Sequence, residues 1–156
     1  MTKFSLLMFG SMFLLYCSPT VEPITFGEDQ CTFCKMSIVD KRYGAEVLTT
    51  KGRVFKYDAL ECMINALCEN NQNAARYLHS AYIIDFSNPG QLFDAKKGFY
   101  LYSKELPSPM GAYLTGFSDS LKANNAQLEY SGEIYKWENV VLKVVGKQTC
   151  EYDFSN

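Results

Sequence analysis

The feature that most constrains this chain is a cluster of sulfur-bearing side chains between Asp29 and Met36. The segment reads Asp-Gln-Cys-Thr-Phe-Cys-Lys-Met, so that Cys31, Cys34 and Met36 place three sulfur atoms within six residues. Thiolate and thioether sulfur are soft ligands, which select Cu(I) over hard ions such as Mg²⁺ or Ca²⁺. Because side chains two residues apart in a strand point to the same face, Cys34 and Met36 can bind one ion together. The segment therefore predicts a site for a soft metal ion, with Cu(I) as the expected ion.

The Cys-x-x-Cys spacing has other known uses. It occurs in zinc-binding knuckles, in thioredoxin-like redox sites and in plain disulfides. Met36 favours copper, because zinc sites rarely use a thioether and dithiol redox sites have no need of one. The alternative is that Cys31 and Cys34 form a small disulfide while Met36 packs in the core. The single histidine, His79, excludes the multi-histidine sites that usually hold catalytic zinc.

Charge and length exclude further classes of protein. The chain of 156 residues carries 15 basic and 17 acidic side chains without a basic stripe, which argues against nucleic acid as the main partner. The length suits one ordinary domain or two small ones. Tyrosine and phenylalanine are abundant, so the core is expected to contain aromatic rings beside β-branched residues.

The first 16 residues resemble an export signal rather than part of the fold. Lys3 precedes an apolar run, Phe4 to Tyr16, that is shorter than the roughly 20 residues a membrane-spanning helix needs. The run ends at Cys17, as in bacterial lipoprotein signals, in which the cysteine becomes the lipid-bearing first residue, although Tyr16 replaces the usual small residue. We therefore predict a lipoprotein signal peptide over residues 1–16, lipid attachment at Cys17, and a domain on the periplasmic side of a bacterial membrane. The alternatives are an uncleaved anchor and an ordinary signal peptide cut nearby.

Two stretches of the remaining chain predict the same order of elements. Residues 17–26 contain two prolines and predict a short tether. Residues 27–88 predict a first unit of strand, strand, helix and strand, residues 89–147 a second unit of the same order, and residues 148–156 a tail. The expected strands lie at 45–50, 53–57, 81–86, 99–102, 113–117 and 133–145. The predicted fold class is α+β, a tandem duplication of two ββαβ units forming one compact body.

Helix positions follow from capping residues. The first helix is expected to begin at Asp58, with Glu61 completing a capping box. The second is a polar helix with Ser118 at its cap. Residues 133–145 are expected to close the chain as one long strand or two short ones.

Six short motifs, in this order along the chain, resemble the family of NosL-type copper chaperones, lipoproteins that serve the maturation of nitrous oxide reductase. The motifs are Asp29–Ile38, Gly52–Asp58 with Cys62-Met63, Ile83–Phe86, Phe93–Ala95, Pro109–Ala112 and Ser131–Ile134. The resemblance extends roughly from Asp29 to Val145. It implies a fold of tandem ββαβ units like that of organomercurial lyase, in agreement with the two stretches described above.

The resemblance also implies a set of copper ligands. The family assigns Cu(I) to the Cys-x-Met pair and to a distant methionine in the second unit, which correspond here to Cys34, Met36 and Met110. Lys35 stands where many members have glycine, so the local turn is expected to be less permissive. The alternative for Met110 is that it fills a gap in the packing.

The other cysteines leave several arrangements open. Cys31 is the second choice as a ligand, and a disulfide between Cys31 and Cys34 would compete with metal binding. Cys68 and Cys150 can pair with each other, or either of them can pair with Cys62. Without Cys17 the number of cysteines is odd, so at least one thiol is expected to be unpaired or bound to metal in an oxidising compartment.

Together the residues and the resemblance predict a metal carrier and not an enzyme. The expected function is an extracytoplasmic Cu(I) metallochaperone that delivers copper to a copper enzyme, with nitrous oxide reductase or its assembly machinery as the expected recipient. Three-coordinate sulfur ligation leaves one side of the ion open, so transfer can proceed through shared coordination. The alternative is a thiol–disulfide oxidoreductase using Cys31 and Cys34, although no thioredoxin-like βαβ start is visible. A cysteine-dependent lyase is suggested by the shared fold alone.

Overall fold

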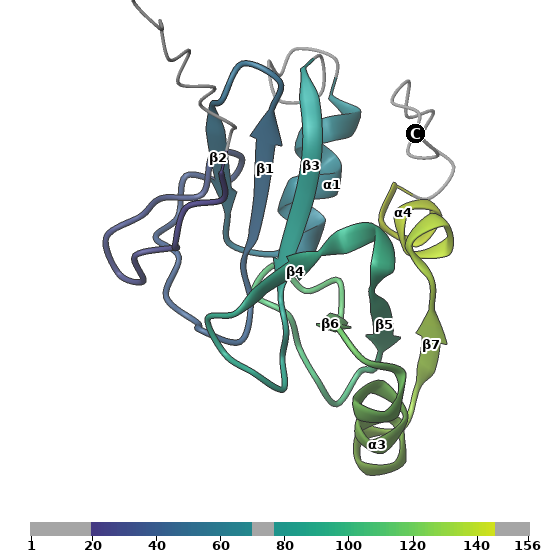
Figure 1. Ribbon diagram of the computed structural model, residues 1–156. Coiled ribbons are helices and arrows are strands. Elements are labelled where there is room, and N and C mark those ends of the chain that lie inside the picture. Colours follow the sequence, from purple (N-terminus) through teal and green to yellow (C-terminus); the bar gives the residue numbers. More distant parts are fainter. Residues whose placement is uncertain (1–19, 70–76, 146–156) are drawn as a thin grey trace, which may run out of the picture.

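The computed structural model describes residues 20–69 and 77–145. Within these residues seven strands form two sheets, each accompanied by helices (Figure 1). The predicted signal peptide, Cys17, the first residues of the tether, Cys150 and the tail lie outside the described residues. In the described part of the chain, no helix is both long enough and apolar enough to cross a membrane.

The first sheet has four antiparallel strands in the order β2-β1-β3-β4. Their bounds are β1 Ala45–Thr49, β2 Val54–Tyr57, β3 Leu78–Ile84 and β4 Leu92–Asp94. The β1–β2 hairpin pairs Ala45 with Tyr57 and turns at Gly52, whose φ is +73°. The strands predicted at 45–50, 53–57 and 81–86 are thus present. β4 lies within the range predicted for the second unit but pairs with β3.

Helix α1 (Leu60–Cys68) packs against one face of this sheet. The apolar side chains of its inner face recur at helical spacing and are buried. They are Leu60, Met63, Ile64 and Leu67. The predicted capping box is wrong, because the residue at the cap is Ala59, without a side-chain hydrogen bond. Asp58 lies one residue earlier, and its backbone N–H helps to lower the pKa of Cys31.

The second sheet has three antiparallel strands in the order β6-β5-β7. Its strands are β5 Phe99–Tyr102, β6 Leu114–Phe117 and β7 Glu133–Tyr135, and α3 (Ser120–Tyr130) connects β6 to β7. The side chain of Asp119 caps α3 by accepting the backbone N–H groups of Leu121 and Lys122. The predicted cap, Ser118, is one residue away, and its hydroxyl donates to Asp85 instead.

The last element of the described residues is a helix, which corrects the strand predicted over residues 133–145. Only β7 is extended, and α4 (Trp137–Val145) follows it. The valines of this segment favour a strand by intrinsic preference. However, Trp137, Val140 and Val141 recur at helical spacing and are all buried, so burial of one apolar face overrides that preference.

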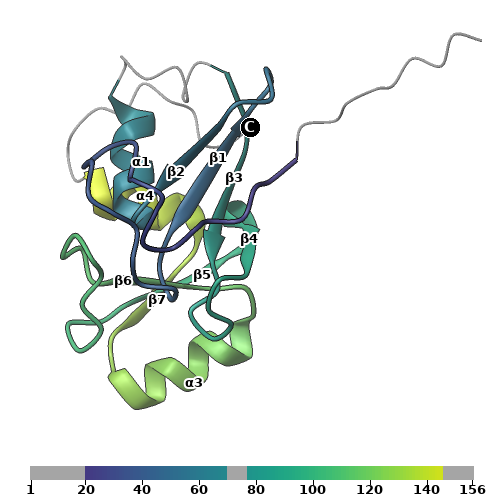
Figure 2. The ribbon, with the colours of Figure 1, turned by 90° about the vertical axis from the view of Figure 1, so that its left-hand side faces the viewer.

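One hydrophobic core joins the two halves of the chain. Its largest cluster combines α1 and the first sheet with Tyr100, Leu114 and Trp137 from the second half. Figure 2 shows α1 and α4 on the same side of the molecule, where the two helices are in contact. A smaller cluster packs under α3. The mixed α+β class is confirmed, and each half contains strand, strand, helix and strand in that order. Tandem duplication stays a prediction.

We expect the turn between α3 and β7 to be sensitive to any side chain at Gly132. Its φ is +105°, and a Cβ there would lie 2.1 Å from the carbonyl oxygen of Tyr102. At Gly52 φ is also positive, but a Cβ would meet nothing within 4 Å. Gly52→Ala should therefore cost only the left-handed backbone strain of about 1–2 kcal/mol, while Gly132→Ala costs clearly more. Urea unfolding of both variants measures the difference, and equal losses would contradict the expected clash.

Candidate metal centre

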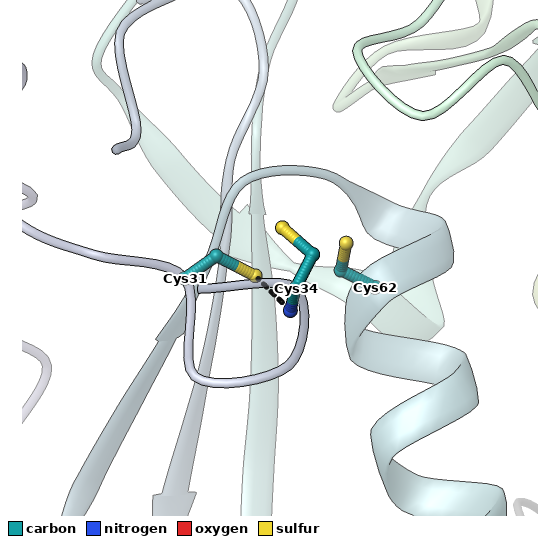
Figure 3. Close-up of side chains that lie close together, drawn as sticks. All are labelled: Cys31, Cys34 and Cys62. Atoms are coloured by element: carbon teal, nitrogen blue, oxygen red, sulfur yellow. Dashed lines mark hydrogen bonds between the residues drawn. The ribbon is translucent and has the colours of Figure 1, made fainter. Parts of the chain in front are cut away.

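Three cysteine sulfurs meet beside the first turn of α1. The Sγ atoms of Cys31, Cys34 and Cys62 all lie within 4.8 Å of one another (Figure 3). All three thiols are free, with Cys31 and Cys62 buried and Cys34 half-buried. In the described parts of the chain, this is the one group of cysteine, histidine and acidic side chains close enough to hold a metal ion together. We refer to it as the thiol cluster.

A tight loop holds the first two cysteines of the cluster. The backbone N–H of Cys31 donates to the carbonyl of Met36 at 2.8 Å, and that of Lys35 donates to the carbonyl of Cys31 at 3.0 Å. Gln30 and Ser37 form an isolated β-bridge below the loop. Lys35 has a φ of +67°, a left-handed conformation that glycine adopts more readily. This is the position where the resemblance led us to expect glycine.

Contacts with β2 bring the loop to the start of α1. The backbone N–H of Thr32 donates to the carbonyl of Lys56 at 2.8 Å. The ammonium group of Lys56 forms an ion pair with Asp29 at 2.8 Å and donates to the carbonyl of Pro23 at 2.9 Å. Because β2 leads within a few residues into α1, this docking places the loop beside Cys62.

Sequence reasoning missed Cys62 as a member of the cluster. Its neighbour Met63 is fully buried in the core, as expected for the inner face of α1, whereas Cys62 turns toward the loop. The sequence signals were its place in a motif shared with the family, Cys62-Met63, and its position a few residues after β2. Recognising it requires knowing that the loop pairs with β2, which is a tertiary contact.

Hydrogen bonds around Cys31 favour its thiolate. The thiol of Cys62 donates to its sulfur, and this is the main reason that the pKa of Cys31 is lowered, against the opposing effect of burial. Backbone N–H groups of Asp58, Cys34 and Phe33 also point at this sulfur, and the nitrogen of Cys34 lies 3.5 Å from it. Since N–H dipoles stabilise negative charge on sulfur, Cys31 is the thiol of the cluster that loses its proton most readily.

The other two thiols are held in their neutral form. The pKa of Cys62 is raised, first because it donates its proton to Cys31 and then because it is buried. Burial is also the main reason that the pKa of Cys34 is raised. Bringing a soft cation to the cluster would offset the charge of one thiolate and favour deprotonation of the other two thiols.

Buried polar groups line the cluster on the protein side. Within the described residues, the hydroxyl of Tyr57 is buried without a hydrogen-bond partner, and burial together with nearby Cys31 and Cys62 raises its pKa. The carboxyl group of Asp58 is also buried, and burial followed by the charge of Cys31 raises its pKa to about 6. The cluster therefore lies in a weakly solvated environment whose neighbouring groups are neutral or acidic. Such an environment favours the binding of a cation.

The two predicted methionines lie at the surface in separate loops. Met36 closes the loop that carries Cys34, and 50% of its surface is exposed. Met110 lies between β5 and β6 with 42% exposed, in a loop that contacts α1 at Glu61, the residue before Cys62. The structure thus brings Cys34 together with two other thiols. The participation of Met36 and Met110 as ligands stays a prediction.

The remaining cysteine of the described residues does not join the cluster. Cys68 is disulfide-bonded, whereas Cys62 is free, so the predicted option of a Cys62–Cys68 pair is wrong. Cys150 lies outside the described residues.

Comparison with known proteins adds a family and a fold. The family model described as NosL matches residues 23–145. The crystal structure of the copper chaperone NosL from Shewanella denitrificans superimposes with a TM-score of 0.65, covering 78% of this chain and 96% of that chain. The two sequences are 16% identical, so this likeness concerns the fold. No match to a curated protein sequence was found.

We expect one thiolate of the reduced, metal-free protein to titrate well below the ordinary cysteine pKa of about 8.5. Ultraviolet thiolate absorbance measured against pH should show this step in the wild type and lose it in Cys31→Ser. Cys62→Ala should shift the step upward, because the main hydrogen bond to Cys31 is lost, and Cys34→Ser should retain it. Because the folded pKa is the lower one, the stability contributed by this thiolate should be lost as the pH falls through it. A low step that persists in Cys31→Ser would contradict the assignment.

Proposed function

This chain belongs to the NosL family, and from that membership and the thiol cluster we propose that it binds copper and acts as a copper chaperone. The observation that carries the proposal is the meeting of three free thiols within 4.8 Å. Sulfur ligands of this kind select soft ions. The crystallised NosL of similar fold is itself described as a copper chaperone.

Cu(I) is the proposed oxidation state, and Cys34 is the proposed central ligand. Cys34 belongs both to the thiol cluster and to the set of Cys34, Met36 and Met110 implied by the family resemblance. It is also the most exposed thiol of the cluster. An ion at Cys34 has the buried thiols of Cys31 and Cys62 on one side and open surface on the other. A ligand of a recipient protein can therefore reach the ion before the chaperone releases it.

The proposed recipient is nitrous oxide reductase or its assembly machinery, and the proposed location is the periplasmic side of a bacterial membrane. The recipient is supported by the family resemblance of the sequence motifs. The location is supported by the apolar run that ends at Cys17, the proposed site of lipid attachment. The proposed role is that of a carrier and not of an enzyme, since the metal itself is the cargo.

A thiol–disulfide oxidoreductase using Cys31 and Cys34 is the second candidate. Its support is the pattern of pKa values, lowered at Cys31 and raised at Cys34, as in a pair of attacking and resolving thiols. However, the side chain of Cys31 is fully buried. A substrate disulfide cannot reach a buried sulfur, so the geometry favours the copper carrier.

We expect the reduced domain to bind Cu(I) far more tightly than Zn(II), with Cys34→Ser the most damaging substitution, because a bound cation deprotonates Cys34 and the resulting thiolate supplies charge as well as softness. Met36→Leu and Met110→Leu conserve volume and should each weaken Cu(I) binding by about tenfold, equivalent to about 1.4 kcal/mol. Met63→Leu is the matched control, because Met63 is buried in the core and should leave affinity unchanged. Competition with a Cu(I) chelator measures each affinity, and circular dichroism confirms the fold.

Two results would contradict this assignment of copper ligands. Zinc bound in preference to copper would exclude the soft-metal site altogether. Full Cu(I) affinity in both Met36→Leu and Met110→Leu, combined with lost disulfide exchange in Cys31→Ser, would favour the oxidoreductase.

We expect Cys17→Ala to release the protein from membranes or to block its processing, because the lipid-bearing residue is removed. Cell fractionation and electrophoretic mobility measure both effects. Cys34→Ser, which changes a free thiol and leaves the export signal intact, is the control and should remain with the membrane. If Cys17→Ala stays in the membrane fraction with unchanged mobility, an uncleaved anchor replaces the lipoprotein signal.

A further inference from the structure

A buried carboxylate connects the thiol cluster to the loop that carries Met110. Glu61 precedes Cys62 in the first turn of α1, and only 3% of its surface is exposed. Its Oε1 accepts a hydrogen bond from the hydroxyl of Ser108 at 2.5 Å. The backbone N–H of Ala112 points to the same oxygen at 3.4 Å. One oxygen atom therefore receives donors from both sides of Met110.

The loop is also closed on itself around Ser108. The Ser108 hydroxyl accepts the backbone N–H of Tyr113 at 3.0 Å, and the Ser108 carbonyl accepts that of Gly111 at 2.9 Å. Tyr113 has a φ of +59°, which is unfavourable for a bulky residue. A conformation of this kind persists only where surrounding contacts impose it, and Glu61 provides such contacts.

Folding stability does not explain why the carboxyl group of Glu61 is buried here. Its second oxygen, Oε2, is buried and has no hydrogen-bond partner among the described residues. A buried polar atom left without a partner is costly, and well-packed apolar residues often stabilise such positions better. The presence of a glutamate at this buried position therefore points to a task other than packing.

We propose that Glu61 is a positioning residue that fixes the 108–113 loop, and with it Met110, relative to Cys62. This inference rests on the proposed function, because it gives Met110 a part in holding copper. Glu61 and Cys62 are consecutive residues of one helical turn. A single rigid element thus sets the place of a buried thiol and, through one carboxylate oxygen, the place of an exposed thioether from the other half of the chain.

The test is a double-mutant cycle on Cu(I) affinity with Glu61→Ala and Met110→Leu. Glu61→Ala removes the acceptor and should weaken Cu(I) binding by up to about tenfold, the lower end of the range for residues that orient metal ligands, and no more than Met110→Leu does. Glu61→Gln keeps an oxygen acceptor and should retain most of the affinity. In the Met110→Leu background, Glu61→Ala should have no further effect, because the ligand that it positions is already absent.

Ser103 provides a matched control for general loss of stability. It is buried like Ser108, donates its hydroxyl proton to the carbonyl of Tyr130 at 2.5 Å, and accepts the backbone N–H of Glu105. Ser103→Ala should lower the unfolding midpoint but leave Cu(I) affinity unchanged. Ser108→Ala should lower affinity as Glu61→Ala does, which keeps the test available if Glu61→Ala fails to fold.

Hydrogen exchange gives a readout that needs no metal. The amides of Ala112 and Tyr113 should exchange faster in Glu61→Ala than in the wild type and remain protected in Glu61→Gln. Equal losses of affinity from Glu61→Ala in the wild-type and Met110→Leu backgrounds would overturn the inference, as would full affinity in Glu61→Ala while Met110→Leu is impaired. Full affinity in Met110→Leu would instead remove Met110 from the proposed copper site, and the positioning role with it.

Discussion

The docking of one loop on the end of β2 is the contact on which the metal centre depends. Thr32 hydrogen-bonds to the backbone of Lys56, and Lys56 pairs with Asp29 through its ammonium group. Both charged partners are partly buried, so the pair is screened less than a fully exposed ion pair. Because the chain runs from β2 directly into α1, two thiols of the loop arrive beside a third thiol on the helix.

In the absence of a cation, the arrangement of the thiol cluster favours one negative charge. Cys31 carries the favoured negative charge through hydrogen bonds from Cys62 and from backbone amides. The neighbouring groups, Tyr57 and Asp58, are buried and offer no compensating cation. Hydrogen bonds stabilise this one charge, whereas burial opposes deprotonation of Cys34 and Cys62, and a bound soft cation would offset that cost by direct ligation. The cluster would therefore reach its full negative charge only with a bound cation.

Local patterns in the sequence were sufficient for most elements, and tertiary contacts account for the failures. The β1–β2 hairpin and the core of α1 follow from alternating and helical spacing, both of which lie within short windows. The end of the chain was misread because the valines of α4 favour strands locally, while the decisive fact is burial against the rest of the core. Cys34 was found from its motif. Cys62 and Glu61 were not, because their roles depend on segments that meet only in the folded chain.

Because α4 packs against α1, the metal centre depends on residues outside the half of the chain that carries its cysteines. All three cysteines of the cluster lie in the first part of the chain, so a fragment ending near residue 88 would contain all three thiols of the cluster. That fragment would nevertheless lack Trp137, Val140 and Val141, which complete the core on which α1 rests. Grafting the cysteine motif onto another scaffold would therefore transfer the ligands without the support that orients them. Any shortened version of this protein has to include α4.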